Sequence, residues 1–81
     1  MSVHSPYASL ATALKERHRI IADRETYHRD PVGHLNSLQN VSEHIEIYAR
    51  QLPEPVDPTL AHYLQRCSFD KALAFIEENH L

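Results

Sequence analysis

Hydrophobic residues recur every three or four positions along two long stretches of the chain. The first set is Tyr7, Leu10, Leu14 and Ile21, and the second is Leu38, Val41, Ile45, Tyr48 and Leu52. This spacing places each set on one face of a helix. The segment Asp30-Pro31-Val32-Gly33 between them carries turn and helix-start signals. The pattern therefore predicts two long helices that fold back on each other as an antiparallel hairpin.

Cap residues and prolines set the boundaries of the predicted helices. Ser5-Pro6 and Asp30-Pro31 each combine an N-cap residue with a proline at the first helical position. Asp57-Pro58 repeats this signal, and Ser68 can cap a last short helix. The prolines between Leu52 and Pro58 alternate with other residues and favour an extended connector.

The sequence thus predicts an all-α fold, a small helical bundle made by one domain over residues 1–81. Its first helix is expected to run unbroken from residue 6 to about 27 or 28, and its second from 31 to about 51. The predicted parts are an antiparallel helical hairpin over 6–51, a Pro-rich elbow over 52–58, and two short C-terminal helices in the region 59–80. These two helices are expected over about 59–65 and 69–79.

Apolar positions outside the main hairpin seam indicate a contact surface. Ala13, Ile20 and Tyr27 form a second stripe on the first helix, and Ile47 lies opposite the main face of the second. A domain of 81 residues buries only about 60–65% of the surface of its unfolded chain, so a second copy would add useful burial. We expect self-association as a homodimer, or binding to another protein, with Ile20, Tyr27 and Ile47 as the first candidates for the contact. Alternatively, the two short C-terminal helices pack on these residues within one chain.

Charge and composition exclude several partners. The formal net charge is −3, with +2 over residues 1–29 and −5 over residues 30–81. This balance gives no general attraction to nucleic acid, and the last predicted helix is too acidic for a DNA-recognition helix. No window approaches the roughly 18 apolar residues of a membrane span. The single cysteine, Cys67, excludes an internal disulfide, so we expect a soluble cytoplasmic protein.

Two arginines on the apolar seam define an alternative function. Arg17 and Arg24 continue the heptad sequence of Tyr7, Leu10, Leu14 and Ile21. A guanidinium keeps its charge when buried. In an antiparallel register whose paired positions sum to about 62, Arg17 lies near Ile45 and Glu46, and His18 faces His44. A small helical anion-ligand-binding protein or enzyme could use Arg17, Arg24, His18 and His44 in a crevice between helices. The simpler interpretation keeps both arginines at the edge of the seam with their charges in water.

Neither a metal site nor a catalytic signature is predicted. Histidine is abundant, but no two histidines stand three or four apart. A metal site would therefore need ligands from different helices. Cys67 has only Arg66 as a nearby base in the sequence, which favours a structural thiol over a nucleophile. We expect no cofactor, and we favour a non-catalytic protein–protein interaction module over an enzyme.

Overall fold

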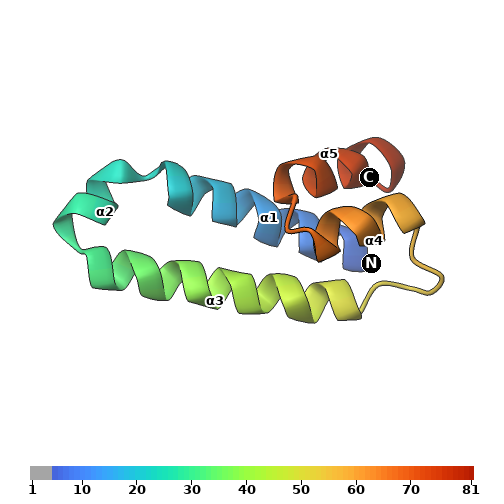
Figure 1. Ribbon diagram of the computed structural model, residues 1–81, viewed down its shortest axis with the longest axis horizontal. Coiled ribbons are helices and arrows are strands. Elements are labelled where there is room, and N and C mark those ends of the chain that lie inside the picture. The colour runs from blue at the N-terminus through green and yellow to red at the C-terminus, as the bar shows by residue number, and fades with distance from the viewer. Residues whose placement is uncertain (1–4) are drawn as a thin grey trace, which may run out of the picture.

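The computed structural model describes residues 5–81, and these residues form an all-α fold as predicted. Its five helices are α1 (Pro6–Ala22), α2 (Arg24–Arg29), α3 (Pro31–Arg50), α4 (Pro58–Gln65) and α5 (Phe69–Asn79). α1 and α3 lie side by side and antiparallel, and α2 closes this hairpin at one end (Figure 1). α5 packs on α1 at the other end, and α4 packs on α5.

Three of the helices begin at the cap-and-proline signals of the sequence. The Ser5 hydroxyl accepts a hydrogen bond from the Tyr7 amide at 3.2 Å, and Asp30 and Asp57 cap α3 and α4 in the same manner. A proline follows each cap, where its missing N–H costs no intrahelical bond. A Cβ at Gly33 would collide with the Asp30 carboxylate, so glycine allows the cap to close over the first turn of α3.

The predicted unbroken first helix is wrong, because the chain bends at Asp23. The Asp23 carboxylate accepts hydrogen bonds from the Thr26 amide at 3.1 Å and from the Thr26 hydroxyl at 2.7 Å. These bonds make Asp23 the N-cap of a new helix, α2. They also lower the pKa of the Asp23 carboxyl, since they favour its charged form. The result is a short, separate helix that turns the chain toward α3.

The hydrophobic core runs between α1 and α3 and continues under α4 and α5. Leu10, Leu14, Leu60 and Ile76 are its largest fully buried side chains. The buried face of α1 differs from the predicted seam at one position. Ile21 was expected in the seam but is 43% exposed, whereas Ile20 is 8% exposed and belongs to the core. Ile20 lies beside Thr26 of α2 and His34 of α3, so the segment after the bend at Asp23 encloses Ile20 and leaves Ile21 exposed.

α5 docks on a second face of α1, as the wide apolar arc of the first helix allows. Ala72 and Ile76 of α5 are completely buried there. The ring of His80 stacks on Tyr7 with 3.8 Å between centroids. Exposed ion pairs flank the contact, such as Lys15 with Glu77 at 3.3 Å, but such pairs contribute about 1 kcal/mol or less. Burial of the apolar side chains therefore holds α5 in place.

Candidate interaction site

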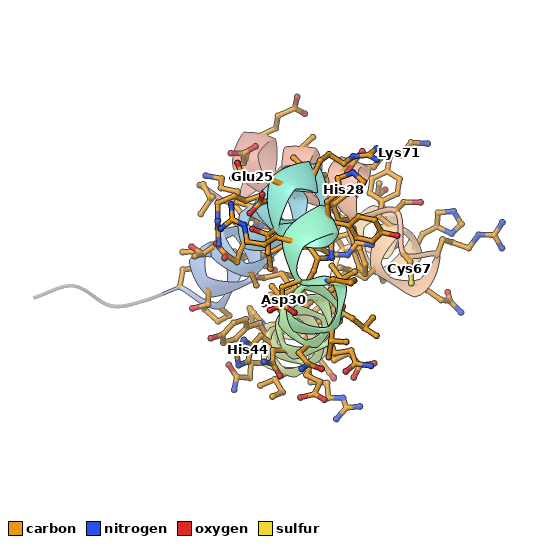
Figure 2. The ribbon with its side chains drawn as sticks, turned by 90° about the vertical axis from the view of Figure 1, so that its left-hand side faces the viewer. Glu25, His28, Asp30, His44, Cys67 and Lys71 are labelled. Atoms are coloured by element: carbon orange, nitrogen blue, oxygen red, sulfur yellow. The ribbon has the colours of Figure 1, made fainter. Side chains whose placement is uncertain are left out.

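The four residues predicted for a ligand crevice do not share one pocket. His18 turns toward α5, where its Nε2 lies 2.9 Å from an Asp70 carboxylate oxygen. His44 lies on the opposite side of the hairpin from Cys67 (Figure 2). Arg24 is exposed on α2. Arg17 is half-buried and lines a groove beside Ile45 and Glu46, which agrees with the predicted helix register.

A first groove opens on the His44 side of the hairpin, and we call it the small-residue groove. Its volume is about 410 Å³, and its lining comes from α1 and α3 alone. The lining residues are Ala8, Ser9, Thr12, Ala13 and Glu16 of α1 with Val41, His44 and Tyr48 of α3. Glu16 forms an ion pair with Arg19, whose hydrogen bond lowers the pKa of the Glu16 carboxyl. The lining combines aliphatic and hydroxyl side chains with His44, and Glu16 is the one carboxylate among these residues.

A second groove runs along α3 on the opposite side, and we call it the α4-side groove. It consists of two hollows of about 460 and 330 Å³ that share Ser42. The open hollow is lined by Leu35, Leu38, Gln39, Ser42 and Glu43. The second is lined by Arg17, Ser42, Ile45, Glu46, Ala49, Leu64, Cys67 and Phe69. α4 and the start of α5 thus wall one half of this groove and leave the other half uncovered.

Arg17 is the cation of the α4-side groove. Its guanidinium carbon lies 4.7 Å from the centroid of the Phe69 ring, a cation–π contact between α1 and α5. Within residues 5–81, no carboxylate lies within ion-pair distance of Arg17. Glu46 lines the same hollow and offsets part of its charge. The hollow therefore combines an apolar lining with one cation and one carboxylate.

The predicted contact residues differ in their exposure. Ile20 belongs to the core, so it contributes no exposed surface, and the sequence prediction is corrected at this position. Tyr27 is 50% exposed and Ile47 is 47% exposed. Leu35, at 53% exposed, is a further apolar side chain that the described residues cover only in part. The sequence analysis did not identify Leu35. Its position three residues before Leu38 was the available signal, because residues three apart lie on neighbouring parts of one helix face.

Neither a metal-binding cluster nor a membrane-spanning helix is present in the part of the chain that the structure describes. Within residues 5–81, no three His, Cys, Asp or Glu side chains are arranged to hold a metal ion. Among the same residues, no helix is both long enough and apolar enough to span a bilayer.

Comparison with protein-family models, with curated proteins and with solved structures finds no match to this chain. Its function must therefore be argued from the geometry of its own side chains.

Proposed function

We propose that the chain is a small, non-catalytic helical module for protein–protein interaction that self-associates as a homodimer in the cytoplasm. The supporting observation is the exposure of large aliphatic side chains beside an apolar groove. Leu35 lines the open hollow on α3 and is 53% exposed, and Ile21, one helical turn after the groove residue Arg17 on α1, is 43% exposed. Contiguous exposed apolar surface of this kind is typical of binding sites on small proteins.

The small size of the core supports the same proposal. Among the five helices of residues 5–81, α1 packs extensively on α3 and α5, whereas α3 packs extensively on α1 and α2 and meets α4 and α5 at one hollow. Most of the outward surface of this twenty-residue helix is therefore free of intramolecular packing. A partner on α3 would bury apolar side chains that the single chain leaves in water.

Sedimentation equilibrium tests this proposal directly. We expect the full chain to form a concentration-dependent dimer between about 1 and about 500 µM, the range in which interfaces of modest size associate. A monomer throughout this range would contradict the proposed self-association.

The half-buried guanidinium of Arg17 supports a second candidate, a site for a small organic anion with an apolar body. The hollow of about 330 Å³ beside Arg17 is lined by Ile45, Leu64 and Phe69. A volume of this order lies within the range of small-molecule pockets. Aromatic and aliphatic carboxylates in a thermal-shift screen would test it. Stabilisation of the parent chain that is lost in Arg17→Met would favour this candidate over the interaction module.

A further inference from the structure

We infer that the partner on the α4-side groove is a second copy of this chain, related by a two-fold axis that places the two hairpins antiparallel. This inference rests on the proposed function, because it specifies the surface that carries the self-association. It moves the contact away from Ile47, which the sequence pattern indicated, to the uncovered half of the groove around Leu35.

The uncovered half of the groove supplies the apolar part of the contact. Leu35 and Leu38 line the open hollow, and Leu35 is 53% exposed. Ile21 follows Arg17 by four residues on α1, so it extends the same side of the helix beyond the region that α4 covers. These side chains come from both helices of the hairpin. A second copy would thus bury the apolar surface of the groove, which α4 and α5 cover only in part.

Sterics fix the relative direction of the two copies. α4 lies over the hairpin at the end away from α2 (Figure 1). Cys67, which follows α4, projects on the side opposite His44 (Figure 2). Two copies pointing the same way would bring their α4 helices into collision. An antiparallel arrangement avoids this, because the α2 end of each copy then lies next to α4 of the other.

Charge complementarity supports the same arrangement. His28 lies on the Cys67 side of α2, with Glu25 on the other side (Figure 2). Arg24 precedes His28 by one helical turn and therefore shares its face. Glu43 lines the open hollow, and Glu46 lines the adjoining hollow that α4 walls. Together with Arg17 of the second hollow, these groups carry a net charge of −1.

Neither Arg24 nor these two glutamates form an ion pair within residues 5–81. Antiparallel packing brings the basic α2 end of one copy toward the acidic part of α3 in the other. Because a two-fold axis repeats each contact, one favourable charge pairing occurs twice in the dimer. Such pairings fix the orientation of partners more than they add affinity.

The experiment compares dissociation constants of the full chain and its variants by sedimentation equilibrium. Leu35→Glu is expected to raise the dissociation constant of the dimer at least tenfold, because it places a carboxylate in the apolar contact. Ile47→Glu is the matched control, since Ile47 is similarly exposed and lies outside the groove. It should leave the dissociation constant unchanged within about threefold, the scatter of surface substitutions.

A charge exchange tests the orientation. Arg24→Glu and the pair Glu43→Arg with Glu46→Arg should each weaken the dimer, and their combination should restore it. A dimer that tolerates Leu35→Glu but dissociates with Ile47→Glu would overturn this inference and leave the proposed self-association intact. Loss of affinity in both charge variants without restoration in their combination would overturn the antiparallel arrangement. Circular dichroism of each variant separates loss of the dimer from loss of the fold.

Discussion

The imidazole Nε2 of His34 lies 2.7 Å from the backbone carbonyl oxygen of Ile20, which joins the start of α3 to the end of α1. The Ile20 carbonyl belongs to the last turn of α1, where backbone acceptors lack partners within the helix. The amide of Asp23 also donates to it, at 3.2 Å. This carbonyl therefore links the bend at Asp23 to the second arm of the hairpin.

Removing the His34 side chain should loosen the closed end of the hairpin. We expect His34→Ala to lower the free energy of unfolding by about 1 kcal/mol, the usual net value of one hydrogen bond. Urea denaturation followed by circular dichroism measures the change. His34→Gln can place an amide donor near the same carbonyl and should retain part of the stability. An unchanged midpoint in His34→Ala would contradict the role of this bond.

The cap at Asp23 predicts a dependence of stability on pH. Hydrogen bonds from Thr26 lower the pKa of Asp23 in the folded chain below its unfolded value of about 3.9. The stabilisation is therefore complete above that value and is lost as the pH falls through the lower folded pKa. We expect the stability difference between the parent chain and Asp23→Ala to be constant from neutral pH to about pH 5 and to shrink below about pH 4.

A second substitution at the same position controls for the titration. Asn is also a good N-cap residue, but its amide does not ionise. The difference in stability between Asp23→Asn and Asp23→Ala should thus vary little over this pH range. The stability of the parent chain and that of Asp23→Asn, each compared with Asp23→Ala, could also fall equally as the pH falls. In that case the acid sensitivity would not come from the Asp23 carboxyl.

Local signals in the sequence were sufficient to predict the helix starts and the hairpin. Caps and prolines act within one turn, so Ser5, Asp30 and Asp57 could be interpreted without knowledge of the tertiary structure. Asp23 was missed because it lies inside a stretch with helical periodicity, and only its bonds to Thr26 show that the helix restarts there. The adjacent residues Ile20 and Ile21 point about 100° apart, and each extends one of the two apolar stripes of the first helix. Periodicity alone therefore could not decide which of the two side chains is buried.

The candidate site was less accessible to prediction from the sequence. The helix register correctly placed Arg17 beside Ile45 and Glu46, because it depends only on the hairpin. The position of His18 depends on α5, whose docking on α1 brings Asp70 to the imidazole. Which half of the groove stays uncovered depends on the position of α4. These features arise from packing between segments far apart in the chain, which short-range patterns do not encode.

Cys67 occupies a backbone conformation that favours glycine. Its φ is 56°, and it follows the C-cap of α4. The Ser68 amide donates to the Tyr63 carbonyl at 2.8 Å, and the Cys67 amide donates to Leu64 at 3.2 Å, which together form a Schellman motif. A side chain in this left-handed region costs about 1–2 kcal/mol.

We therefore expect Cys67→Gly to raise the free energy of unfolding by about 1 kcal/mol, because it removes the steric cost of the side chain. Cys67→Ala removes the thiol but keeps a Cβ, so it should give little gain. Chemical denaturation of the three proteins under reducing conditions measures this. Equal gains in the glycine and alanine variants would assign the effect to the thiol instead of the backbone.

The docking of α5 depends on side chains such as Ile76, which is completely buried. Ile76→Val removes one methylene from this contact, and we expect it to lower the free energy of unfolding by about 1 kcal/mol. Ile47→Val removes the same group from a half-exposed position and should change stability by less than about 0.5 kcal/mol. Thermal unfolding of both variants at equal concentration provides the comparison. Equal losses would show that α5 is not packed on α1 as the structure describes, because the two positions differ chiefly in their burial.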